Sequence, residues 1–157
     1  MSDLSEPSAG SPDALARARA RRHALAGAAD GLEAALAHPA GDAPAWRDGV
    51  ASALDALDAA LADHIEEVEG PDGLYAEILE RTPRLAHRID LLRREHGELR
   101  DRLAAIQPLL ADPVDARHIE QAREEALELL KQISRHRHRG ADLVFESYDA
   151  DIGGEGD

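Results

Sequence analysis

The sequence predicts an all-α protein, an antiparallel up-down-up-down four-helix bundle with a short extra helix between the second and third helices. Aromatic residues make up only 3% of the chain, and alanine and leucine dominate its apolar content, which favours closely packed helices over a β-sandwich. Apolar residues recur three and four positions apart in four long stretches joined by short turns. This spacing is typical of helices that bury one face in a bundle, and 157 residues suffice for one domain with such a core.

Capping residues, prolines and glycines mark where the helices start and end. A serine, threonine or aspartate before a proline is a good helix start, because its side chain satisfies a free backbone amide and the proline has none to satisfy. Ser11-Pro12, Thr82-Pro83 and Asp112-Pro113 share this signature. Together, these signals predict helices over residues 11–38, 42–70, 71–81, 82–108 and 112–148.

The two ends of the chain differ from this helical pattern. Residues 1–10 are polar and contain serine, proline and glycine, whereas residues 150–157 are acidic and glycine-rich. Such segments bury too little apolar surface to fold by themselves. We therefore expect two disordered tails around one helical domain that spans residues 11–149.

Gly27 and Gly31 lie inside the first predicted helix. Each glycine weakens the helix by roughly 1 kcal/mol relative to alanine. We interpret both, together with the alanines around them, as positions at which a neighbouring helix approaches closely.

The charge and composition limit the classes of partner and site. A net charge of −14 argues against nucleic acids and anionic membrane surfaces as partners, because both repel an acidic protein. With no cysteine in the chain, any metal site has to use histidine, aspartate, glutamate or tyrosine. The sequence has no membrane-spanning stretch, signal-peptide pattern, nucleotide-binding loop or hydrolase motif. We therefore expect a soluble cytoplasmic protein.

Three of the eight histidines are predicted to face the core. Positions three, four and seven residues apart share a helix face, and His64, His96 and His136 each lie in the middle of an apolar stripe on a different helix. His23 is ambiguous, because it faces small residues but lies at a depth along the first helix that could bring it near the others. The remaining histidines are expected at the surface: His38, His87, His118 and His138.

Core histidines on several helices point to a metal more strongly than a single one does. One histidine on an apolar face is more often satisfied by a hydrogen bond, since a buried imidazole without a partner is costly. Facing helices of a bundle, however, build metal sites from inward side chains, and neutral imidazole is a common metal ligand. The alternative is a metal-free bundle, acting as a binding or regulatory module, whose histidines hydrogen-bond to one another or to glutamates. Convergence of the rings would favour the metal.

Carboxylate ligands could come from the end of the second helix. Glu67 follows His64 by three residues, about 60° from its face, and could swing inward. Glu69 precedes the glycine-proline pair that ends the helix, so the helical period does not fix its direction. Both glutamates could also belong to a solvated acidic face. Glu95, beside His96, is expected to be solvated and to pair weakly with nearby arginines.

Four short segments carry the candidate histidines: Arg22-His23-Ala-Leu25, His64-Ile-Glu-Glu67, Leu91-Leu-Arg-Arg-Glu95-His96-Gly-Glu-Leu99 and Arg135-His136-Arg-His138. In order and spacing they resemble the hemerythrin-like (HHE) domain family, over about residues 21–148. Arginine almost replaces lysine, since Lys131 is the only lysine among 18 basic residues, as in proteins from GC-rich bacterial genomes. A closer resemblance to an actinobacterial branch rests on Glu69-Gly-Pro-Asp-Gly-Leu-Tyr75, Pro83-Arg-Leu-Ala86 and Arg139-Gly-Ala-Asp-Leu-Val-Phe-Glu146.

The resemblance implies a four-helix bundle with a non-haem di-iron centre that binds O2 or NO, or that senses iron or redox state. The family's carboxylate positions hold Val68 and Gly140 in this sequence. Bridging carboxylates neutralise two close irons and fix their separation, so a histidine site without them holds one metal more naturally than two. We therefore predict an iron-binding protein for gas binding, redox sensing or metal handling, without committed catalytic turnover. The predicted metal ligands are His23, His64, Glu67, Glu69, His96 and His136.

Overall fold

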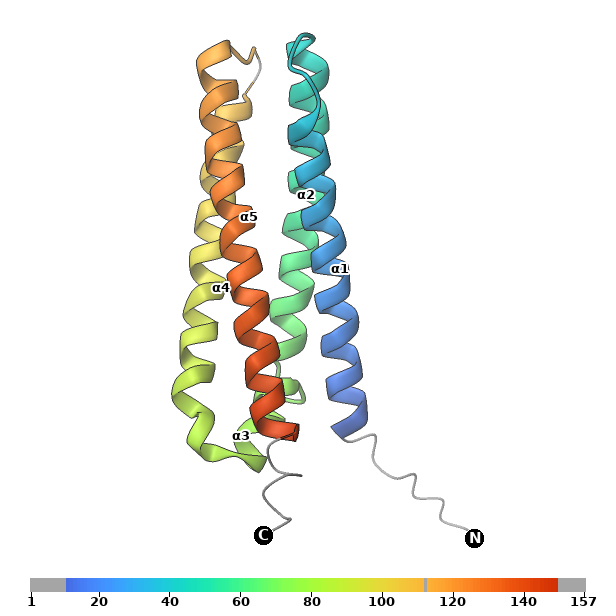
Figure 1. Ribbon diagram of the computed structural model, residues 1–157, viewed down its shortest axis with the longest axis vertical. Helices are drawn as coiled ribbons and strands as arrows, with labels where there is room; N and C mark the ends of the chain where they lie inside the picture. Colours follow the sequence, from blue (N-terminus) through green and yellow to red (C-terminus); the bar gives the residue numbers. More distant parts are fainter. Residues whose placement is uncertain (1–10, 112, 150–157) are drawn as a thin grey trace, which may run out of the picture.

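The computed structural model describes residues 11–149 except residue 112, and this part of the chain forms a helical bundle without strands. In Figure 1 each long helix runs antiparallel to the next, and α3 lies at the end of the bundle where α1 starts and α5 ends. The predicted all-α four-helix bundle is confirmed, whereas the predicted tails, residues 1–10 and 150–157, lie outside the described residues. The elements are α1 (Ser11–Ala37), α2 (Ala43–Glu69), α3 (Leu74–Arg81), η1 (Pro83–Leu85), α4 (Ala86–Ile106), η2 (Gln107–Leu110), α5 (Ala116–Val144) and the π-helical turn η3 (Phe145–Asp149).

Side-chain caps set the starts of α2 and α5, and three helices start later than predicted: α3, α4 and α5. Helix α4 begins at Ala86 rather than at residue 82, because the 3-10 turn η1 precedes it. Helix α2 begins as predicted, since the Asp42 carboxylate accepts a hydrogen bond from the Ala45 amide at 3.1 Å. Helix α5 begins four residues later than predicted, because Asp115 caps it by accepting from the His118 amide at 2.8 Å. Helix α3 begins at Leu74 rather than at residue 71, because the preceding residues form a tight turn.

Glycine is required in this turn but not inside α1. A Cβ atom on Gly73 would lie 2.2 Å from the backbone oxygen of Glu67, so no other residue fits there. At Gly27 and Gly31 an added Cβ atom would meet nothing within 4 Å, and both residues are exposed. The interpretation of these two glycines as sites of close helix contact is therefore wrong. Each lies on the outer face of α1, away from buried Leu25 and Leu32.

The buried apolar side chains form two clusters along the bundle axis. The larger cluster fills most of the bundle and includes Leu61 of α2 and Leu99 of α4. The smaller cluster lies around α3 and includes Val68 and Leu92. Within the described residues, no helix is both long and apolar enough to cross a membrane. The space between the two clusters holds the polar side chains described next.

Candidate metal centre

A layer of polar side chains separates the two apolar clusters. Each long helix has an apolar face that contributes to both clusters. Between the two clusters, one residue on this face is an arginine or a histidine instead of an apolar residue. On α1 this position is Arg22, which is half-buried, four residues after Ala18 and three before Leu25. We call this group the polar layer, and it consists of Arg22, His64, His96 and His136.

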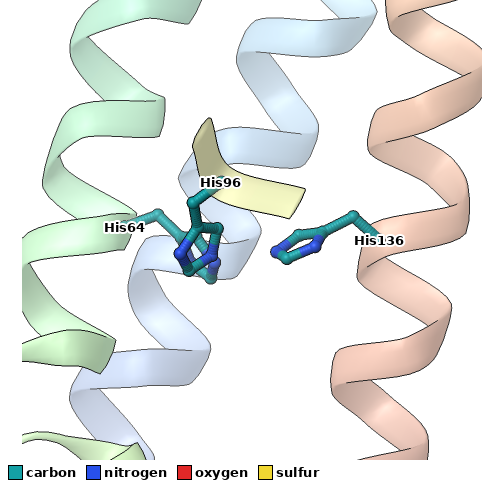
Figure 2. Close-up of side chains that lie close together, drawn as sticks. All are labelled: His64, His96 and His136. Atoms are coloured by element: carbon teal, nitrogen blue, oxygen red, sulfur yellow. The ribbon is translucent and has the colours of Figure 1, made fainter. Parts of the chain in front are cut away.

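The three histidines of the polar layer converge from α2, α4 and α5 (Figure 2). Their ring centroids lie 5.2 Å apart for His64 and His96, 5.8 Å for His64 and His136, and 4.7 Å for His96 and His136. One ring nitrogen from each lies within 4.8 Å of the ring nitrogens offered by the other two. All three side chains are buried, with exposed fractions of 8%, 2% and 3% in chain order. Together they could hold a metal ion.

Two carboxylates stand behind these rings. Glu69 Oε2 lies 2.5 Å from Nδ1 of His96, and Glu95 Oε1 lies 2.7 Å from Nδ1 of His136. An Nδ1–H that donates to a carboxylate fixes the tautomer and leaves the other ring nitrogen, Nε2, with its lone pair for a metal. Tyr75 stacks on the His96 ring at 6.1 Å between centroids and 8° between planes, which further fixes that ring.

Burial lowers the pKa of all three imidazoles. Desolvation lowers the pKa of His64 to about 4 and that of His96 to about 2, and the charge of the neighbouring His136 adds to both shifts. The pKa of His136 is also lowered by burial, although its hydrogen bond to Glu95 opposes the shift. The three rings are therefore neutral at pH 7, which is the form that binds metals.

The unpaired nitrogens fit a metal better than they fit a closed hydrogen-bond network. Both ring nitrogens of His64 and Nε2 of His96 are buried without a hydrogen-bond partner among the described residues. Leaving a buried polar group unpaired costs roughly 1–3 kcal/mol, and native structures rarely tolerate it without a reason. A divalent ion would accept the lone pair of one His64 nitrogen and that of His96 Nε2, and the carboxylates of Glu69 and Glu95 would offset its charge.

A cavity opens beside the histidines. Its volume is about 260 Å³, and both His64 and His136 line it, between α1 and α5. A metal bound by three imidazoles keeps an open coordination position when space for a further ligand adjoins it. The cavity supplies that space on one side of the polar layer.

Two of the six predicted ligands lie away from this cluster. His23 is exposed on α1, because Arg22 rather than His23 occupies the position between Ala18 and Leu25. Glu67 pairs with Arg17 of α1, whose Nε lies 2.9 Å from its carboxylate. The structure therefore corrects the placement expected for His23 and Glu67.

The third carboxylate, Glu69, reaches the site but contacts a ring nitrogen of His96. The structure thus brings together His64, Glu69, His96 and His136 of the predicted set, with the glutamate behind a histidine in the position of a supporting residue.

Glu95 is the supporting residue that the sequence analysis missed. Its side chain is only 18% exposed, and it binds both His136 and Arg139 of α5. The expectation of a solvated Glu95 is therefore wrong, whereas its expected pairing with an arginine is confirmed by Arg139. The signal in the sequence is slight, since a residue next to a core histidine lies at the edge of the buried face, where a long side chain can reach the next helix.

We compared the chain with protein-family models, with curated proteins and with solved structures, and none of them matches it.

Proposed function

We propose that this protein binds a single first-row transition metal ion through His64, His96 and His136. The convergence of three buried, neutral imidazoles on one point carries this proposal. Carboxylates behind two of the rings are the usual supporting partners of histidine ligands. One ion is favoured over two, because no carboxylate of the described residues bridges the rings and the family's carboxylate positions hold Val68 and Gly140.

We propose iron as the metal, on the resemblance of the histidine segments to the hemerythrin-like family. In this proposal the ion binds O2 or NO at its open position, senses redox state, or is itself the cargo. The cavity beside His64 and His136 gives a small ligand access to that position.

Zinc is the second candidate, because the three converging ligands are all imidazoles. A three-histidine set with one open position is a common zinc arrangement, whereas mononuclear non-haem iron usually takes two histidines and one carboxylate. Movement of Glu69 from His96 onto the ion would add a carboxylate to the three histidines, which would make the ligand set more like that of iron. Metal selectivity therefore depends on whether Glu69 stays behind the ring.

Metal content is the direct test. The protein is produced with added iron, purified anaerobically and analysed by elemental mass spectrometry, and the metal-free protein is then titrated with Fe²⁺ and with Zn²⁺. We expect about one ion per chain. Replacing His64 and His136 by alanine should abolish binding, whereas His138→Ala, at an exposed position two residues from His136, should not change it.

Two results would overturn the proposal. One is a metal content far below one ion per chain that stays low in both titrations. The other is binding that survives the double replacement. If metal is absent and chelators leave the melting temperature unchanged, the protein is the metal-free bundle. If only Zn²⁺ binds, the iron proposal fails, and if only Fe²⁺ binds, electron paramagnetic resonance with NO tests for an open position.

A further inference from the structure

Three arginines line the cavity beside the histidines. Arg19 and Arg22 of α1 and Arg137 of α5 line it, and none of the described residues in its lining is aspartate or glutamate. The chain has 32 acidic residues and a net charge of −14. The cavity lining therefore has the opposite sign of charge to the chain as a whole. A local excess of positive charge attracts an anion.

The arginines are close to one another and incompletely hydrogen-bonded. Nε of Arg22 and Nε of Arg137 are both buried, and neither has a hydrogen-bond partner within the described part of the chain. Burial and the charges of Arg137 and Arg19 lower the pKa of Arg22, so these cations repel one another. Buried cationic donors without acceptors are costly unless a bound anion supplies the acceptors.

The rest of the cavity is apolar. Leu15, Leu143 and Val144 contribute aliphatic surface, and Phe145, which is 61% exposed, stands at its edge on η3. A large exposed aromatic side chain beside a cavity offers contact area to a ligand rather than to the core. The volume of about 260 Å³ lies just below the roughly 300–1,000 Å³ of sites for drug-sized molecules, so the ligand is small.

We propose that this cavity binds a small organic carboxylate that has an apolar body. The carboxylate head lies against the guanidinium groups of Arg22 and Arg137, which match a carboxylate through paired hydrogen bonds. The apolar body lies against Val144 and Phe145. The inference goes beyond metal binding and does not require the metal, since neither arginine is a metal ligand.

The experiment titrates the full-length, metal-free protein with hexanoate by isothermal titration calorimetry at pH 7. Two further probes test the contributions of the carboxylate and of the apolar chain separately: acetate lacks the apolar chain, and hexan-1-ol lacks the charge. We expect saturable binding of one hexanoate per chain, and at least about tenfold weaker binding of acetate and of hexan-1-ol. The absence of saturable hexanoate binding, or equal binding of all three probes, would overturn the proposal.

Variants test the site itself. Arg22→Gln and Arg137→Gln should each weaken hexanoate binding by about tenfold or more, because each removes a charged donor. Arg21→Gln and Arg135→Gln are matched controls on the same helices, at exposed positions outside the cavity lining, and should bind as the parent protein does. Equal weakening in all four variants would mean attraction by overall charge only, and the site would be rejected.

Phe145→Ala serves as a variant that does not endanger folding, because the ring is largely exposed. It should weaken hexanoate binding and leave acetate binding unchanged. If it changes neither, the apolar part of the proposal is wrong. Because all of these measurements use metal-free protein, failure of metal binding would leave their outcome unaffected, and failure here would leave the metal proposal intact.

Discussion

Leu61 and His64 lie one turn apart on the buried face of α2, yet we expect them to contribute oppositely to stability. Leu61 is fully buried in the larger apolar cluster, where removal of its surface from water stabilises the fold. His64 is buried almost as completely, but neither of its ring nitrogens has a hydrogen-bond partner in the described chain. A position that lowers the stability of the bare protein is typical of a functional site. The contrast therefore marks the polar layer as a place for a ligand.

The polar layer also differs from one side to the other. Glu69 of α2 and Glu95 of α4 stand behind His96 and His136. On the side facing α1, Arg22 and Arg137 line the cavity beside His64 and His136. Carboxylates near the rings favour a cation among them, whereas the arginines favour an anion beside it.

The largest expected effect compares the two positions on α2 directly. In metal-free protein at pH 7, Leu61→Ala should lower the free energy of unfolding by about 2–5 kcal/mol, because it leaves a cavity in the core. His64→Leu should instead raise it by about 1–3 kcal/mol, because it removes buried polar atoms without partners. Chemical denaturation of both variants measures this. A loss at His64 as large as the loss at Leu61 would mean that the imidazole is well satisfied.

The pH dependence of stability should reflect the same imidazole. The pKa of His64 is about 4 in the folded protein against an ordinary value of 6.5, so the unfolded chain binds the proton more tightly. Stability is therefore full above pH 6.5 and falls as the pH drops toward 4, by roughly 3 kcal/mol from His64. Denaturation of the metal-free protein between pH 7 and pH 4 tests this. The loss should shrink in His64→Leu, and an unchanged loss would contradict the assignment.

Metal removal should lower thermal stability. An ion at 100 times its dissociation constant stabilises the folded state by about 2.7 kcal/mol, because the unfolded chain lacks the assembled site. For a chain of this length, a chelator should therefore lower the melting temperature of the loaded protein by roughly 5–10 °C. In the variant with alanine at His64 and His136 the chelator should have no effect. A chelator effect of equal size in that variant would place the metal elsewhere.

The smallest expected effect concerns the carboxylates. Glu95→Gln should weaken metal binding by about 10–100-fold, because His136 loses a charged partner. Glu67→Gln is the matched control. It removes an ion pair with Arg17 that is worth no more than about 1 kcal/mol, and it should leave the metal affinity unchanged. Competition titration against a chelating dye measures both, and an equal loss in the two variants would reject the supporting role of Glu95.

The periodicity of the sequence predicted which histidines face the core. His64, His96 and His136 are buried as predicted, and the histidines expected at the surface are all exposed: His38, His87, His118 and His138. On α2, α4 and α5, large apolar side chains on one face and charged ones on the other define how the helix turns toward its neighbours. A histidine within such a stripe therefore has a determined direction.

The tertiary structure decided the rest. Alanine occurs on every face of α1, so apolar spacing does not fix its rotation, and packing placed Arg22 rather than His23 toward the other helices. Glutamate side chains are long enough to reach several partners. Whether Glu67, Glu69 or Glu95 contacts a histidine therefore depends on which side chains of the neighbouring helix lie close to it. The sequence by itself determined the bundle and the inward direction of three imidazoles, because both follow from local period. Only the packed bundle decided that the rings meet, because the distance between helices depends on all the side chains between them.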